Sequence, residues 1–112
     1  MREERKILRY KLVVKGLYGR NRKVKFELFT LVKECDPATP KTLDELMPMY
    51  KAKLVEIKFK GGSAWIEEDP ITLNTHDMGD GKSYTTESYL LMSGKTLHKE
   101  KIEGAGLVFS AA

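Results

Sequence analysis

The sequence contains very little cysteine and no apolar run long enough for a membrane helix. Its single cysteine, Cys35, cannot form an internal disulfide, and no cluster of His and Cys surrounds it that would bind zinc. The first apolar runs are short and are broken by Arg9, Lys11 and Lys15, which argues against a signal peptide or a spanning helix. We therefore expect a cytoplasmic protein with no membrane partner.

The remaining composition is that of an ordinary globular protein. Of the 112 residues, 41% are hydrophobic and 32% are charged, a balance typical of folded chains. A chain of this length buries roughly two thirds of the surface that its unfolded form exposes, so it needs neither a disulfide nor a metal for stability. We expect residues 1–112 to form a single domain without a cofactor or a metal.

Positive charge is concentrated near the N-terminus. Residues 1–25 contain ten Lys or Arg and two Glu, a net charge of +8, whereas residues 67–112 have a net charge of −4. Three explanations are open at this point. The basic segment binds an anionic ligand, or it lies beside an acidic strand in one sheet, or the two segments pair between copies of the chain in a homo-oligomer.

An alternation of apolar and charged residues predicts a β-hairpin. Over residues 7–14 the even positions are apolar and the cations Arg9 and Lys11 lie between them. After a glycine-containing loop at 16–22, the pattern restarts with Val24 and continues through residue 28. Adjacent apolar pairs then interrupt it, which favours a bulge or burial on both faces and a central second strand.

The rest of the chain predicts one short helix and several short strands. Thr42 and Glu45 fit a capping box that opens a helix at Leu43, and Pro48 is expected to limit that helix. Pro70 is expected to break a strand or to mark an edge. Further strands are predicted at 51–60, 84–92, 96–102 and 107–109, and one more at 63–67 and 71–73, interrupted at Pro70. A loop is predicted at 74–82 and a hairpin turn at 93–95.

This order of elements predicts a mainly β fold of the α+β class. Six to seven short strands, closely spaced turns and one short helix favour a small antiparallel barrel or a strongly curved sheet, with an OB-like barrel as the best fit. A β-grasp arrangement with a longer helix is the alternative.

The basic hairpin is the main candidate for a binding site. Alternating cations with nearby tyrosines suit single-stranded nucleic acid, because phosphates contact the cations while bases stack on aromatic rings. Trp65 is either a second stacking surface or a core residue, and a solvated lysine face is the alternative for the hairpin itself. The predicted nucleic-acid-binding residues are Arg9, Lys11, Lys15, Tyr18, Arg20, Arg22, Lys23 and Lys25.

Two other functions are alternatives to nucleic-acid binding. A protein-interaction module, such as an inhibitor, adaptor or assembly subunit, would place the same hairpin against an acidic protein surface or a second copy. A metal-dependent nuclease would use Glu56 and Lys58 as an acidic-x-Lys strand motif, with Asp36 as a further metal ligand. Because such a tripeptide arises by chance in any strand rich in Lys and Glu, we expect a non-enzymatic protein with no catalytic residues.

Overall fold

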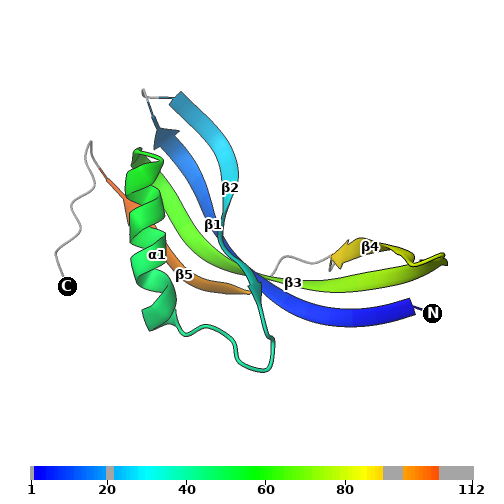
Figure 1. Ribbon diagram of the computed structural model, residues 1–112. Helices are drawn as coiled ribbons and strands as arrows, with labels where there is room; N and C mark the ends of the chain where they lie inside the picture. Colours follow the sequence, from blue (N-terminus) through cyan, green and yellow to red (C-terminus); the bar gives the residue numbers. More distant parts are fainter. Residues whose placement is uncertain (1, 20–21, 90–94, 104–112) are drawn as a thin grey trace.

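A computed structural model describes residues 2–19, 22–89 and 95–103 of the chain (Figure 1). Within these ranges the protein has five strands and one helix. The strands pair antiparallel in the order β2-β1-β3-β4, and β5 also pairs with β3. The elements are β1 (Arg2–Tyr18), β2 (Arg22–Cys35), α1 (Leu43–Glu56), β3 (Phe59–Gly79), β4 (Lys82–Tyr89) and β5 (Thr96–Ile102).

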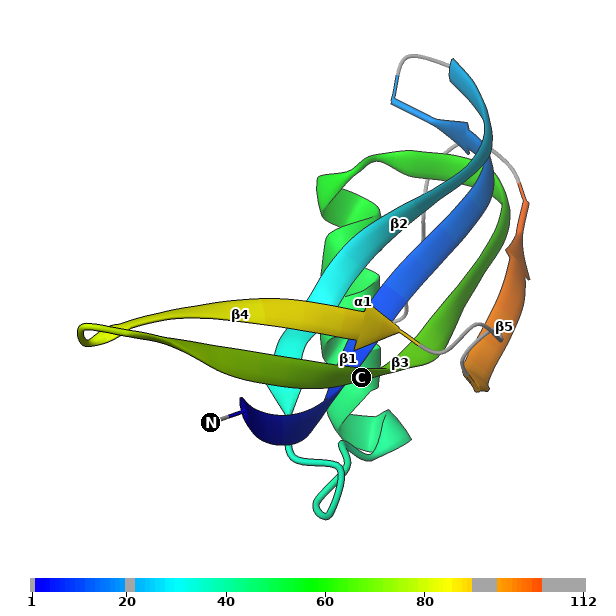
Figure 2. The ribbon, with the colours of Figure 1, turned by 90° about the vertical axis from the view of Figure 1, so that its right-hand side faces the viewer.

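The strands form one curled sheet, a half-barrel that covers one side of α1 (Figures 1 and 2). On one side β3 pairs with β1 along nearly its whole length, and on the other it pairs first with β5 and then with β4. The start of β1, the end of β3 and β4 extend away from the helix, and we call this three-stranded extension the arm (Figure 2). The mainly β fold with one helix is confirmed, and the described residues contain five strands where the whole chain was predicted to have six to seven.

The hydrophobic core lies between α1 and the sheet. The apolar positions of β1 predicted by the alternation, from Leu8 to Val14, pack there against Ala64 and Ile66 of β3. Because side chains alternate along a strand, these residues define the inner face of the sheet, and the residues between them lie on the outer face. From α1 the core receives Leu46, Tyr50 and Leu54, all with 0% exposure.

The helix begins as predicted but is longer than expected. Thr42 accepts a hydrogen bond from the backbone N–H of Glu45, and the Glu45 side chain accepts one from the N–H of Thr42, which confirms the capping box. The strand predicted at 51–60 is wrong over residues 51–58, because α1 continues through Pro48 to Glu56 and β3 begins only at Phe59. The buried residues recur every four positions along α1, and their packing outweighs the hydrogen bond that a proline removes.

Replacing Pro48 with alanine should stabilise the protein. Pro48 lies on the exposed side of α1 and offers no N–H to the carbonyl of Asp44. Alanine restores that donor, and we expect a gain of about 1–2 kcal/mol in the free energy of unfolding, measured by urea denaturation. The exposed neighbour Met49→Ala serves as the control and should change this free energy by less than about 0.5 kcal/mol. A P48A variant no more stable than wild type would contradict the prediction.

β3 is continuous where the sequence predicted two short strands. Pro70 does not break the strand, and it pairs in register with Leu8 of β1. In the described residues, the pairing of β3 with β5 ends at Glu67 and the pairing with β4 begins at Ile71. The proline therefore occupies a local edge of the strand, where a missing N–H is tolerated.

The segment at 74–82 was expected to be a loop, but it consists mostly of strand and contains only a tight hairpin turn. β3 extends to Gly79, and Asp80 and Gly81 connect it to β4 with positive φ angles of 55° and 73°. An Asp-Gly pair between two strands is a strong hairpin signal that the sequence interpretation missed. The strand at 96–102 is confirmed, and it pairs with β3. Residues 90–92 of the strand predicted at 84–92, residues 93–94 of the predicted turn and the strand predicted at 107–109 lie outside the described residues.

The N-terminal hairpin is confirmed, with two corrections. β1 extends to Tyr18 and β2 begins at Arg22, so residues 16–18 and 22 of the expected loop belong to strands. The pairing with β2 contains register shifts, one of them beside Val32, as expected for a bulge. β2 is not central, since in the described residues it pairs with β1 alone. At the end of β1, Gly16 lies directly opposite Gly62 of β3.

Candidate functional site

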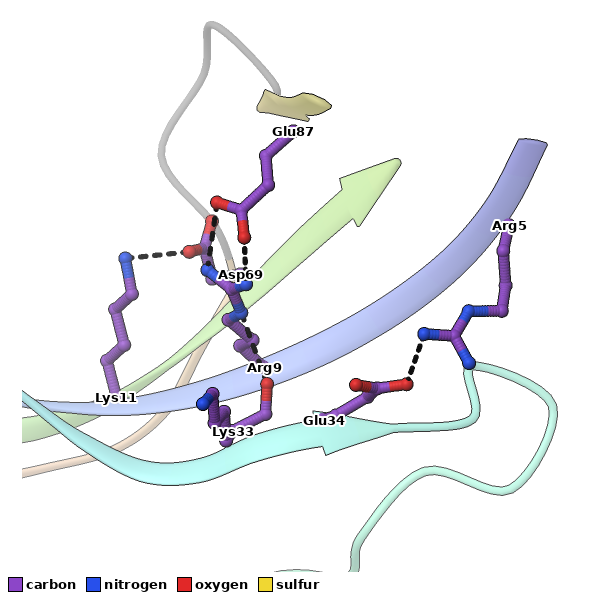
Figure 3. Close-up of polar contacts among 7 residues, drawn as sticks. All are labelled: Arg5, Arg9, Lys11, Lys33, Glu34, Asp69 and Glu87. Carbon is purple, nitrogen blue, oxygen red and sulfur yellow. Dashed lines mark hydrogen bonds and ion pairs between the residues drawn. The ribbon is translucent and has the colours of Figure 1, made fainter. Parts of the chain in front are cut away.

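Two of the predicted binding cations, Arg9 and Lys11, form ion pairs within the sheet (Figure 3). The Arg9 guanidinium lies 2.6 Å from a carboxylate oxygen of Glu87 and donates through Nε to the carbonyl of Lys33 at 3.1 Å. The Lys11 ammonium lies 2.7 Å from Asp69. Both cations are largely shielded from solvent, with 17% and 24% of their side chains exposed.

The strand register explains this neutralisation. Arg9 lies opposite Asp69, and Lys11 lies opposite Glu67. The most acidic segment of the chain therefore lies beside the basic strand. Lys11 pairs with Asp69 across these two strands, whereas Arg9 reaches Glu87 on β4. Part of the charge polarity in the sequence is thus explained by ion pairs within one sheet.

The cations nearer the hairpin turn are not shielded from solvent as Arg9 and Lys11 are. The exposed ones include Lys15, Lys23 and Lys25. Tyr18 packs partly against the core, and the guanidinium carbon of Arg22 lies 5.7 Å from the centre of its ring. Tyr18 is therefore not a free stacking surface. Arg20 lies outside the described residues.

The tyrosine near this turn also interacts with an acidic neighbour. A hydrogen bond with the Glu27 carboxylate, together with partial desolvation, raises the pKa of Tyr18 above its ordinary value. Glu27 lies opposite Val14, an inner-face residue. This contact further directs Tyr18 away from a ligand on the outer face.

The outer face carries two apolar residues of β2 that the alternation predicts on the same face as Val24. Phe26 is 58% exposed and Leu28 is 49% exposed. Between Val14 and Gly16 the pairing of β1 with β2 shifts by one residue. A shift of one residue moves the following side chains to the opposite face, so Val24 lies opposite Gly16 while Leu28 lies opposite the outer-face residue Val13.

Trp65 completes a row across the outer face. The register aligns Leu28, Val13, Trp65 and Lys99 on four adjacent strands. Trp65 is partly buried, and its indole N–H donates to Glu67 at 3.1 Å. The Lys99 ammonium lies 5.4 Å from the Trp65 ring centre, within the range of a cation–π contact. Trp65 is therefore neither a fully buried core residue nor a bare stacking surface.

These residues form the best-defined candidate for a binding surface. An exposed phenyl ring and a partly exposed indole lie on the same face as the exposed Lys15 and Lys99. The exposed Lys25 lies beside Phe26, at the register shift of β2. The sequence interpretation included Lys15 and Lys25 and considered Trp65 as a second stacking surface. It missed Phe26, Leu28 and Lys99, because the bulge and the pairing of β5 are not encoded in local periodicity. We call this surface the outer patch: Lys15, Lys25, Phe26, Leu28, Trp65 and Lys99.

The residues of the nuclease hypothesis do not have the geometry that it requires. Glu56 is the last residue of α1, and Lys58 follows the helix with a positive φ of 57°. The motif needs both residues on a strand, and neither lies on one. In the described ranges, no group of three or more His, Cys, Asp or Glu side chains is arranged to hold a metal ion.

Searches with this chain find no matching family model, curated protein or solved structure. Within the described residues, no helix is long and apolar enough to cross a membrane. The outer patch is therefore the main basis for inferring a function.

Proposed function

We propose that the outer patch binds single-stranded nucleic acid and that the protein acts as a binding protein rather than an enzyme. The observation that supports this best is the alignment of aromatic rings and lysines on one sheet face. Phe26 supplies an exposed ring on which a base stacks, and the partly exposed edge of Trp65 extends this apolar surface. Lys15, Lys25 and Lys99 supply charge for phosphates.

The dimensions of the patch suit an extended strand. From β2 to β5 it crosses three strand spacings, about 14 Å. The bases of a duplex are stacked inside it, whereas those of a single strand are accessible to Phe26 and Trp65. We therefore expect a preference for single strands over duplexes of equal charge.

A role as a protein-interaction module is the second candidate. Exposed Phe26 and Leu28 beside lysines also suit a partner that offers apolar side chains with an acidic rim. The two functions differ in salt dependence, because binding to a nucleic-acid polymer releases condensed counterions whatever its sequence.

The test is a titration of labelled poly-pyrimidine single strand and of duplex DNA, followed by fluorescence anisotropy at low and physiological salt. The triple variant of Lys15, Lys25 and Lys99 to alanine should lower the single-strand affinity at least about tenfold at low salt and reduce the salt slope by about two. Phe26→Ala should lower the affinity about fivefold or more, as expected for loss of one stacked base.

The control removes the same charge away from the patch. Lys6, Lys58 and Lys95 are exposed and lie outside it, and their triple alanine variant should retain affinity within about threefold, since only the general field of the protein changes. Equal losses in both triple variants would contradict a defined site. Absence of binding even at low salt would overturn the proposal and favour the protein-interaction module.

A further inference from the structure

The sheet has several free backbone edges, and they differ in their protection. In the described residues, β2, β4 and β5 each pair with one neighbour, and β1 lacks a second neighbour before Leu8. A free edge is a template for pairing with another chain, so proteins usually protect it with charges, bulges or proline.

Three of these edges carry such protection. β2 has exposed lysines at 23, 25 and 33 and several register shifts against β1. The free part of β1 contains five consecutive charged residues at 2–6. β5 is short, and charged residues occupy 99–101. These features disfavour the addition of another strand.

β4 lacks this protection. Its register with β3 is regular from Tyr89 to Ser83, and it contains no proline. Between Lys82 and Glu87 lie four uncharged residues, Ser83 to Thr86, all exposed. Threonine and tyrosine are favoured in strands, so this edge is well suited to accept another strand.

The arm that carries β4 also lacks a core of its own. Across β3 and β4, Asn74 donates to Ser88 at 3.3 Å, and the hydroxyls of Thr75 and Thr85 lie 3.3 Å apart. The rings of His76 and Tyr84 stack with their centres 4.6 Å apart. α1 packs on the broad part of the sheet and not on the arm (Figure 1). A small uncovered ribbon of this kind is stabilised when further strands extend it.

We propose that β4 pairs with β4 of a second copy, antiparallel and around a two-fold axis perpendicular to the sheet. Such an axis places odd-numbered residues of one β4 opposite odd-numbered residues of the other, and even-numbered residues opposite even-numbered ones. In the register centred on Thr85, Lys82 lies opposite Ser88 of the partner subunit and Glu87 lies opposite Ser83 of the partner subunit, so no like charges meet. The partner is a second copy because this self-complementary pairing closes a dimer.

This inference goes beyond the proposed function and is tested without a ligand. Sedimentation velocity over a range of protein concentrations should show a dimer that dissociates on dilution. Thr85→Lys would place two lysines opposite each other at the axis and should weaken the dimer at least about tenfold. The matched variant Thr30→Lys, at an exposed position of β2, should leave the dimer unchanged.

Crosslinking provides a second readout that does not depend on weakening the dimer. In a Cys35→Ser background, Thr85→Cys should give a covalent dimer with a short bifunctional thiol reagent, whereas Thr30→Cys should not. A wild-type protein that stays monomeric at several hundred micromolar would overturn the proposal. A dimer weakened by T30K but not by T85K would also overturn it and assign the interface to β2. Nucleic-acid binding is measured separately, by the titration described above.

Discussion

Replacing Gly62 with alanine is expected to destabilise the protein by about 3 kcal/mol or more. Gly62 has a φ of +120°, a conformation that side chains rarely adopt. It lies opposite Gly16, and an added Cβ would overlap the carbonyl oxygen of Lys15. The two backbones would have to separate at this pair of glycines, so the loss includes strand pairing as well as strain.

The matched control is Gly81→Ala in the turn between β3 and β4. Gly81 also has a positive φ, 73°, but a Cβ there would meet no atom within 4 Å. We expect a loss of about 1 kcal/mol, which is the conformational cost alone. Urea denaturation followed by circular dichroism measures both variants. Equal losses would show that the contact between Gly16 and Gly62 is not as close as described.

Replacing Leu54 with alanine should cost about 2–5 kcal/mol of the free energy of unfolding. Leu54 is fully buried and lies on α1 in line with Leu46 and Tyr50, which attach the helix to the inner face. Alanine favours the helix itself, so the loss reports the cavity between helix and sheet and not a weaker helix.

The neighbouring residue provides the control for this variant. Val55 is 55% exposed, and Val55→Ala should change the free energy of unfolding by less than about 0.5 kcal/mol. Thermal denaturation of the two variants should therefore show a large decrease in Tm for L54A only. Similar decreases for both would contradict the packing of α1 through Leu46, Tyr50 and Leu54.

Local signals in the sequence predicted the parts of the fold that depend on local interactions. The capping box at Thr42, the alternation along β1 and the strand at 96–102 are all present. The errors arise where distant segments meet. Pro48 lies inside α1 because the sheet packs on that helix, and Pro70 lies inside β3 because the pairing of β5 and β4 leaves a gap beside it.

The candidate site was also predicted only in part, because it too depends on contacts between distant segments of the chain. The sequence indicates that Lys15 and Lys25 belong to an exposed basic hairpin, and both are exposed. It cannot indicate that Arg9 and Lys11 are paired with carboxylates more than fifty residues away in the chain, since register is a long-range property. Phe26 was assigned to the wrong face because a single bulge reverses the alternation.

The pairing of β1 with β3 sets the order in which the chain can fold. Arg2 pairs with His76 and Tyr18 with Phe59, so the second neighbour of β1 becomes available only after the helix and its loops have been synthesised. Contacts between such distant segments slow folding, typically to milliseconds or longer. The β1–β2 hairpin and α1 can form early from local contacts, whereas the half-barrel closes only when β3 docks beside β1.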